Sequence, residues 1–424
     1  MIRFDRSVLA NDPERRAVVI DLLETALDAV DPYRVTSSAL RRTNHQLVVG
    51  GNTVDLAGID RVIVLGLGKA APAMAAAAAE VLTDLNPNGV VVAAADADVP
   101  PGIELIVGSH PLPTDASRRA GQRLLDAAAG ATDRDLVITV VSGGGSALAE
   151  VPEEGVDIKE LAEITKTLLR AAVPIDQVNA VRTRLSRLKG GGLAAAARGT
   201  QLVTLVLSDV VGSPLHVVAS GPTLVPLQST EVAAHVARML PETVRVALDN
   251  YTSPIRHDHH TTCLVADGTT AANALVEAAA ARGIDARLAE EPLAGEACGA
   301  PDRILAAAAE AGLVVFAGET VVDVRGSGIG GRNQELALAA AIAVEGDGDL
   351  LVAALATDGV DGPTTAAGAL VDGATVLRAR ERGFDPGASL ANNDAYPLLA
   401  AAGDLLVTGP TGTNVADLAV VWRL

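Results

Sequence analysis

Residues 61–69 read RVIVLGLGK, and residues 135–146 read DLVITVVSGGGS. In both stretches a run of aliphatic, largely β-branched residues ends in glycines, which is typical of a buried strand followed by a tight turn. Further runs of this kind alternate with helical stretches: strands at 89–93, 104–107 and 202–207, helices at 69–82, 114–129 and 157–171. This alternation predicts a parallel, doubly wound α/β sheet.

A second α/β series follows a polar connection at 239–260. Its expected strands are 261–266, 284–288, 312–317, 350–356 and 404–408, and its expected helices are 269–282, 332–344, 373–382 and 390–401. An amphipathic helix is expected at 13–30, beginning at a proline after Asp12. The sequence therefore predicts a Rossmann-like N-terminal domain, residues 1–240, and a smaller α/β domain, residues 241–424, with a ligand cleft between them.

The composition excludes several classes of partner. The formal net charge is −19, so nucleic acid and anionic membranes, which need basic surfaces, are not expected partners. Only four of the 33 basic residues are lysines: Lys69, Lys159, Lys166 and Lys189. An acidic, lysine-poor chain fits either a high-salt cytoplasm or a GC-rich genome, and the composition does not choose between them.

Targeting signals and disulfides are not expected either. The chain has two cysteines, which imply neither a disulfide framework nor a cysteine-based zinc site. The first 16 residues include three carboxylates and no apolar segment typical of a signal peptide. No apolar run reaches the roughly 18 residues of a membrane-spanning helix. The expected location is the cytoplasm.

Glycine-rich loops follow five of the expected strands: GLGK, SGGGS, SDVVG, TDGVDGP and TGPTGTN. In open α/β sheets, ligands bind beyond the carboxyl ends of the strands. Glycine lets backbone N–H groups approach an anion closely, and helix N-termini add a favourable dipole. Several such loops in two domains favour a phosphate-rich ligand.

Lys69 and the SGGGS loop carry the first candidate site. Gly66–Ala71 resembles the GxGxxA dinucleotide fingerprint, but the acidic residue expected about 20 positions later is absent. Lys69 follows these glycines at an expected helix N-terminus, where a positive charge suits a phosphoryl or carboxylate group. Ser142–Ser146 could cradle phosphate, although it lacks the P-loop pattern. A surface lysine and a flexible loop are the alternative interpretations.

Asp209 and Arg332 are the other candidates for chemistry. Asp209 ends an apolar strand, where a carboxylate could hold Mg²⁺ or orient an attacking hydroxyl, or could only cap a turn. Arg332 follows a glycine-rich loop at an expected helix N-terminus, and arginine binds carboxylate or phosphate with two N–H groups. His110 is expected to have a structural role, and His257, His259 and His260 are expected in a solvated loop.

The motifs, in this order, resemble the glycerate 2-kinase family, the two-lobed kinases once labelled hydroxypyruvate reductases. The stretches that carry the resemblance include GLGKAAPAM, GSHPLPTDAS, VNAVRTRLSRLKGGGLA, LVLSDVVG, GGRNQELALAAA and ATDGVDGPTTAAGA. Ten such stretches lie between about residues 61 and 420. The chain departs from the family pattern at Ser213-Pro214, at Thr183-Arg184, at Thr365 and after Thr223. These departures bear on metal coordination and nucleotide choice.

The resemblance implies ATP- and Mg²⁺-dependent phosphorylation of D-glycerate at its 2-hydroxyl. Lys69, Asp209 and Arg332 match catalytic positions, and Asp209 is also the expected metal ligand. The expected nucleotide-binding residues are Ser142, Gly143, Gly144, Gly145, Ser146, Lys189, Ser220, Gly221 and Thr223. The expected substrate-binding residues are Gly68, Lys69, Arg332, Asp358 and Asn414. A homodimer is compatible with this interpretation.

Two other functions stay open at this point. The GxGxxA-like turn is also compatible with an NAD(P)H-dependent hydroxypyruvate reductase, although the missing acidic ribose contact and the several phosphate-type loops count against it. A non-catalytic nucleotide or organic-acid sensor is a third possibility. The joint presence of Lys69, Asp209 and Arg332 favours an enzyme instead.

Overall fold

A computed structural model describes residues 2–171, 173–210, 212, 214–226 and 231–424. The chain forms two compact units. Unit 1 comprises Met1–Asp31, Asp209–Gly212 and Ala266–Leu424, and unit 2 comprises Pro32–Ser208 and Ser213–Val265. The division expected at residue 240 does not coincide with these units, because the N-terminal segment belongs with the C-terminal part and residues 241–265 belong to unit 2.

Unit 2 contains a six-stranded sheet in the order β6-β5-β4-β7-β8-β9. The strands are β4 (Arg61–Leu67), β5 (Asn88–Ala93), β6 (Ile103–Val107), β7 (Asp135–Val141), β8 (Gln201–Leu207) and β9 (His260–Ala266). The pairs from β6 through β8 are parallel. Numbered along the sheet this is the 3-2-1-4-5-6 order of doubly wound folds, which confirms the predicted fold class. β9, expected to open the second series, instead completes this sheet.

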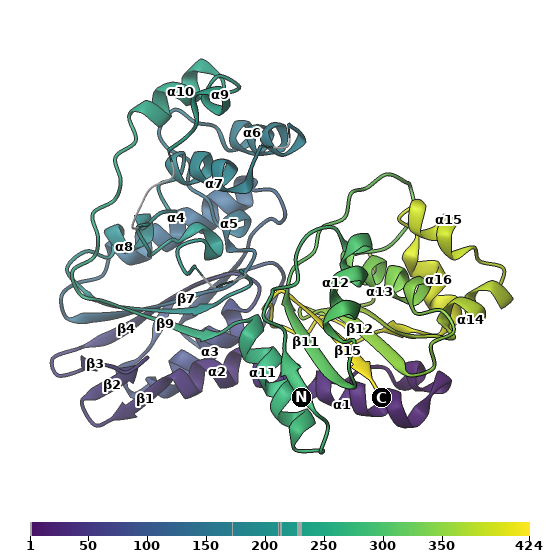
Figure 1. Ribbon diagram of the computed structural model, residues 1–424. Coiled ribbons are helices and arrows are strands. Elements are labelled where there is room, and N and C mark those ends of the chain that lie inside the picture. The colour runs from purple at the N-terminus through teal and green to yellow at the C-terminus, as the bar shows by residue number, and fades with distance from the viewer. Residues whose placement is uncertain (1, 172, 211, 213, 227–230) are drawn as a thin grey trace. The chain divides into compact units, whose positions relative to one another are not determined.

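Helices cover both faces of the sheet in unit 2 (Figure 1). α2 (Pro32–Ala39) and α3 (Ala71–Val81) lie on one face, and α4 (Asp115–Ala129) and α8 (Gly192–Ala196) lie on the other. Both faces of β7 are therefore buried, which explains its uninterrupted run of aliphatic residues. A small antiparallel sheet adds β1 (Leu40–Thr43), β2 (Gln46–Val49) and β3 (Asn52–Asp55), none of which the sequence predicted.

A helical cluster with its own hydrophobic core completes unit 2. Its core includes Leu168, Val181, Val236 and Val244, all fully buried. The helices are α6 (Ile158–Arg170), α7 (Ile175–Arg184), α9 (Ala234–Ala237) and α10 (Glu242–Asp249), and the short α5 (Gly145–Leu148) follows β7. α7 also carries Arg182, whose side chain donates to Ser146.

Unit 1 is built on a mixed sheet in the order β10-β11-β15-β12-β13-β14. The strands are β10 (Ala286–Leu288), β11 (Gly312–Gly318), β12 (Leu350–Ala356), β13 (Gly368–Asp372), β14 (Leu405–Leu406) and β15 (Asp417–Arg423). β15 runs antiparallel between β11 and β12. The sequence pattern had not identified β15 or β13 as strands. Because β15 is antiparallel to both neighbours, its first residue lies where β11 and β12 end.

The helices of unit 1 also lie on two faces of its sheet (Figure 1). α1 (Pro13–Ala29) and α11 (Gly268–Ala280) pack together on one face. The other face carries α12 (Ala300–Ala307), α13 (Arg332–Ala343), α14 (Thr375–Glu381), α15 (Pro386–Ala391) and α16 (Ala395–Ala402). The single helix expected at 390–401 is replaced by α15 and α16, which a break at 392–394 separates.

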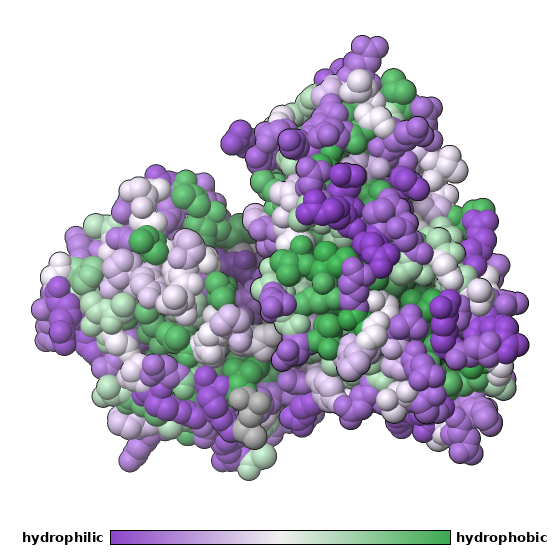
Figure 2. All heavy atoms as spheres, turned by 180° about the vertical axis from the view of Figure 1, so that it is seen from behind, coloured by the Kyte–Doolittle hydropathy of each residue, from purple (hydrophilic) through white to green (hydrophobic). Residues whose placement is uncertain are grey.

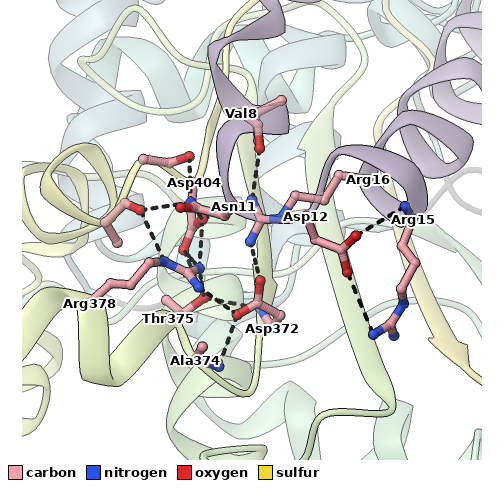
Figure 3. A network of polar contacts seen from close by, with 12 residues as sticks. Val8, Asn11, Asp12, Arg15, Arg16, Asp372, Ala374, Thr375, Arg378 and Asp404 are labelled. Atoms are coloured by element: carbon pink, nitrogen blue, oxygen red, sulfur yellow. Dashed lines mark hydrogen bonds and ion pairs between the residues drawn. The ribbon is translucent and has the colours of Figure 1, made fainter.

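A buried arginine attaches α1 to the C-terminal half of unit 1 (Figure 3). Arg16 is fully buried, and its guanidinium lies 2.5 Å from Asp372 Oδ2 and 2.8 Å from Asp404 Oδ1. Arg378 and Thr375 donate further hydrogen bonds to Asp404. A buried carboxylate needs such partners, so residues far apart in the sequence depend on one another here.

The face shown in Figure 2 is mainly polar. Hydrophilic residues occupy much of the face shown in Figure 2, interrupted by smaller hydrophobic patches. Within the described residues, no helix combines the length and the apolar character needed to cross a membrane.

Candidate active site

The first group of candidate residues lies at the switch point of the sheet in unit 2. The chain progresses toward one edge from β4 and toward the other from β7, so the loops at their carboxyl ends diverge and leave a crevice where ligands bind in such folds. Gly68, after β4, has φ +128°, and a Cβ there would lie 2.2 Å from Ser142 Oγ after β7. Glycine is therefore required for the two loops to touch.

Lys69 is held against the three-glycine loop. Its backbone N–H donates to Gly143 O at 3.0 Å, and the next N–H, of Ala70, donates to Ser142 Oγ at 3.0 Å. A Cβ on Gly144 would lie 3.5 Å from Lys69 Cγ and 3.6 Å from His110 Cδ2. The structure thus brings together Gly68, Lys69 and the SGGGS loop as expected. It also adds His110, to which the sequence analysis gave only a structural role.

The Ser220 loop lies beside this cradle. Ala219 and Ser220 have φ of +50° and +61°, although neither is glycine, and such strain concentrates at functional sites. The Ala219 Cβ lies 2.7 Å from where a Cβ on Gly145 would be. Thr223, expected to bind nucleotide, is only 3% exposed, and its hydroxyl accepts a hydrogen bond from Thr204 at 3.0 Å. Its position favours a structural role.

Lys189 occupies the interior of unit 2 rather than an exposed loop. Its side chain is 1% exposed, and its ammonium pairs with the buried carboxylate of Glu150. Burial lowers the pKa of Lys189 to about 8, against the opposing charge of Glu150. This location does not favour direct contact with a nucleotide. A neighbouring side chain does reach the glycine loop, because Arg182 donates to Ser146 O at 3.2 Å and to Ser146 Oγ at 3.0 Å.

The second group, in unit 1, centres on Arg332 at the first position of α13. Its Nε and Nη2 donate to the two oxygens of Asp417 at 2.5 and 2.8 Å, and its Nη1 lies 2.8 Å from Glu319 Oε1. Burial lowers the pKa of Arg332, but the hydrogen bonds and charge of Asp417 outweigh it and raise the pKa overall. Three of the five N–H groups face these two carboxylates, which leaves two for an anion.

Asp361 caps the same helix. Its carboxylate accepts from the backbone N–H groups of Asn333 at 3.2 Å and Gln334 at 2.8 Å. A Cβ on Gly331 would lie 2.3 Å from Asp361 Cγ, so the glycine makes room for this carboxylate. Burial raises the pKa of Asp361 to about 6, although both N–H groups lower it. An anion could therefore meet the Arg332 side chain, but these two backbone donors are already occupied.

Further expected residues gather at the same edge of the unit 1 sheet. Asn414 donates to Asp209 Oδ2 at 3.3 Å. Thr411 N donates to Asp358 O at 3.1 Å, which joins the TDGVDGP and TGPTGTN loops. Burial raises the pKa of Glu319, and the charges of Asp417, Asp209 and Asp358 raise it further, against Arg332. Together with Asp361, the arrangement is one arginine among five carboxylates.

Comparisons with known proteins show the family to which the chain belongs. A family model described as "Domain of unknown function (DUF4147)" matches residues 18–251, and one described as "MOFRL family" matches residues 312–417. The D-glycerate 2-kinase of Thermotoga maritima is 37% identical, with 96% of this chain and 99% of the relative covered. The chain belongs to the glycerate kinase family. Its homologues' names establish it as a kinase.

A second relative and a solved structure support this assignment. The glycerate 2-kinase of Pyrococcus horikoshii is 35% identical, with 96% of both chains covered. The crystal structure of a glycerate kinase from Thermotoga maritima has a TM-score of 0.85 and 34% identity, and covers 97% of this chain and 100% of that one. The two-lobed α/β architecture is therefore shared across nearly the full length.

The carboxylates of unit 1 suit a cation that arrives with a ligand better than a resident metal. Within the described part of the chain, no group of three or more His, Cys, Asp or Glu side chains is arranged to hold a metal ion. Mg²⁺ in kinases of small molecules is commonly held by one or two carboxylates together with substrate phosphates and water. Asp209 fits that donor set, and the charges of Asp209 and Asp358 both act on Glu319.

The sequence did not indicate that Asp417, Glu319 and Asp361 belong to these groups, and it indicated only a structural role for His110. Asp417 begins β15, and Glu319 directly follows β11. A carboxylate beside the end of an apolar run is a weak local signal, and only strand pairing shows that both reach Arg332. Ser213, one of the departures from the family pattern, lies outside the described residues.

Proposed function

We propose that this member of the glycerate kinase family transfers the γ-phosphoryl group of ATP to the 2-hydroxyl of D-glycerate, giving 2-phosphoglycerate. The observation that carries the proposal is Lys69 held against the three-glycine loop at the switch point, where phosphate would meet backbone donors and a positive charge. The names of the relatives support glycerate as acceptor.

Catalysis of phosphoryl transfer depends mainly on positioning and charge stabilisation. In our proposal Gly143–Gly145 and the Ser220 loop hold the nucleotide phosphates. Lys69 and Arg332 are assigned to the transferring phosphoryl group and the substrate carboxylate, and Asp358 and Asn414 are further substrate-binding residues. Mg²⁺ bound with the nucleotide would neutralise phosphate charge. The 2-hydroxyl oxygen bonds to the γ-phosphorus, the bond to the bridging oxygen breaks so that ADP leaves, and the hydroxyl proton is released to water. Asp209 orients the attacking hydroxyl or the metal.

Two assays separate this proposal from the alternative of a hydroxypyruvate reductase. The first couples ADP release to NADH oxidation with ATP and D-glycerate, and the second follows NADH directly with hydroxypyruvate. We expect turnover only in the first, and phosphorus NMR should identify 2-phosphoglycerate. A 3-phospho product would overturn the regiochemistry, and turnover only in the second assay would overturn the proposal.

Charge-removal variants test the assigned roles. Lys69→Ala should lower kcat by about 10²–10³-fold, because one preorganised charge-stabilising group is lost. Arg332→Lys should also be slow, since a point charge cannot replace a planar fork. Arg332→Ala is the less useful variant, because it also strips fully buried Asp417 of its partner and should cost about 3–5 kcal/mol of stability.

Matched controls use charges outside the two groups. Lys166→Ala removes an exposed lysine that pairs with Glu163, and Arg325→Ala removes an exposed arginine that pairs with Asp323 in the loop before Arg332. Both should turn over at the wild-type rate. Turnover of Lys69→Ala within about threefold of wild type would exclude the charge-stabilising role assigned to it.

A further inference from the structure

Unit 2 contains a pocket of about 320 Å³ next to the Ser220 loop. One side is formed by α7, and the other by residues 216–226 and 251–253. Its size is at the lower end of the range of about 300–1,000 Å³ found for small-molecule sites. We infer that this pocket binds the purine base and ribose of a nucleotide whose phosphates lie at Gly143–Gly145. The inference rests on the proposed function and names where the phosphate donor is recognised.

The pocket, the Ser220 loop and the Gly143–Gly145 loop follow one another in unit 2, as the base and ribose are followed by the phosphates in a nucleotide. Ser220 lines the pocket, and Ala219, its neighbour, touches Gly145. The adjoining Gly144 is close to Lys69. Base and ribose would thus lie in the pocket, and the phosphates would extend from the Ser220 loop at its edge to the glycine cradle. The lining residues that the structure describes all belong to unit 2.

The lining supplies a surface on which a base can stack. The Arg184 guanidinium lies 5.7 Å from the centroid of the Tyr251 ring, and both residues line the pocket. Bases stack on aromatic rings and on arginine planes, at about 1–3 kcal/mol for each base on an aromatic side chain. Aromatic residues make up only 2% of the chain, so a half-exposed tyrosine at a pocket is not explained by composition.

The pocket lining also contains side chains that could form hydrogen bonds with the edge of a base. Asn179 and Asp176 line the pocket on α7. An amide presents a donor and an acceptor side by side, which is the arrangement that pairs with adenine, and a carboxylate can accept from the exocyclic amino group of adenine. The Asn179 amide has no hydrogen bond to another side chain or backbone group in the described part of the chain. A ligand could therefore satisfy it.

The same lining disfavours phosphate as the occupant. Ile175, Val217 and Pro226 contribute apolar surface, and Asp176 adds a negative charge. Among the described lining residues, Arg184 is the one that is an arginine or a lysine. Phosphate sites instead gather several N–H donors or cations. The pocket is also held in place, because α7 packs through Val178, Val181 and Leu185 on its helical core. A preformed site loses less entropy on binding.

Calorimetric titration of the full chain with ADP tests the inference. Asn179→Ala should weaken ADP binding about tenfold, the loss of roughly one hydrogen bond. Tyr251→Ala should weaken it about 10- to 100-fold through lost stacking. Ser253→Trp places a large side chain at an exposed position of the rim, so it should block the pocket without disturbing the fold. Tripolyphosphate should bind all variants as it binds wild type.

Arg170→Ala is the matched control for these variants, because Arg170 is exposed at the end of α6 and does not line the pocket. It should bind ADP as wild type does. Titrations with GDP and CDP complete the experiment: both purines should bind at least about tenfold more tightly than CDP. Equal binding of CDP and ADP, or of tripolyphosphate and ADP, would overturn the inference.

Failure of the inference and failure of the proposed function give different results. If the three pocket variants phosphorylate glycerate with an unchanged KM for ATP and bind ADP normally, the pocket is not the base site, while the proposed function stands. If wild type binds ADP and the pocket variants do not, but neither wild type nor the variants phosphorylate glycerate, the base site stands and the proposed function is wrong.

Discussion

At the scale of single residues, Asp361 makes stability depend on pH. Burial raises its folded pKa to about 6 from an ordinary value of 3.8. Between about pH 4 and pH 6 the folded state holds a proton that the unfolded state has released, so this residue's contribution to stability falls as pH rises. The total is on the order of 3 kcal/mol, because one pKa unit corresponds to about 1.4 kcal/mol.

Asp361→Asn preserves the shape of the side chain and removes its titration. We expect the free energy of unfolding of wild type, minus that of the variant, to decrease from pH 4 to pH 6 and then level off. Urea unfolding at several pH values measures this difference. A difference that stays constant over the range would mean that the carboxylate is less buried than its 2% exposure indicates.

At the scale of elements, α1 is an integral part of unit 1 because of Arg16. Arg16→Ala should cost about 3–5 kcal/mol, since it deprives fully buried Asp404 of a partner while Arg378 keeps part of the network. Arg15→Ala on the same helix is the control: Arg15 bonds to Gly348 O at 2.7 Å and is 3.7 Å from Asp12, so its loss should cost at most about 1 kcal/mol. Denaturant unfolding of both variants tests this, and equal losses would contradict it.

The elements also show what the sequence could predict. β4, β5, β7 and β8 were predicted because both of their faces are buried, and an uninterrupted aliphatic run is a local signal. Strand pairing is not local. Nothing in residues 417–423 marks β15 as the partner of both β11 and β12, and nothing in 261–266 assigns β9 to the first sheet.

In the candidate site, too, residues with a local sequence signal were predicted, and residues that meet only through strand pairing were not. The Lys69 cradle was predicted because glycines at strand ends mark it in the sequence. The carboxylates of Asp417 and Glu319 were missed, because they meet Arg332 only after β15 inserts into the sheet. The ion pair of Lys189, a residue expected from the family resemblance, could not be predicted from the sequence either, because its partner, Glu150, is 39 positions earlier.

At the scale of the whole molecule, the net charge of −19 should make thermal stability depend on the salt concentration. Repulsion among carboxylates weakens as the Debye length falls from about 10 Å at 0.1 M salt to about 3 Å at 1 M. Exposed ion pairs such as Arg134–Asp60 and Arg123–Glu104 are weakened too, but such pairs contribute only about 0–1 kcal/mol each. With 19 more acidic than basic groups, we expect repulsion to dominate and the Tm to rise from 0.1 to 1 M KCl.

A variant with fewer negative charges separates screening of charge from other effects of salt. Asp96→Asn, Asp98→Asn and Glu154→Gln together neutralise three exposed carboxylates of unit 2. If screening is the cause, the rise in Tm with KCl should be smaller in this triple variant than in wild type. Equal rises would indicate exclusion of salt from the surface, which does not depend on charge. A Tm that stays flat or falls in wild type would favour the GC-rich genome as the origin of the acidic, lysine-poor composition.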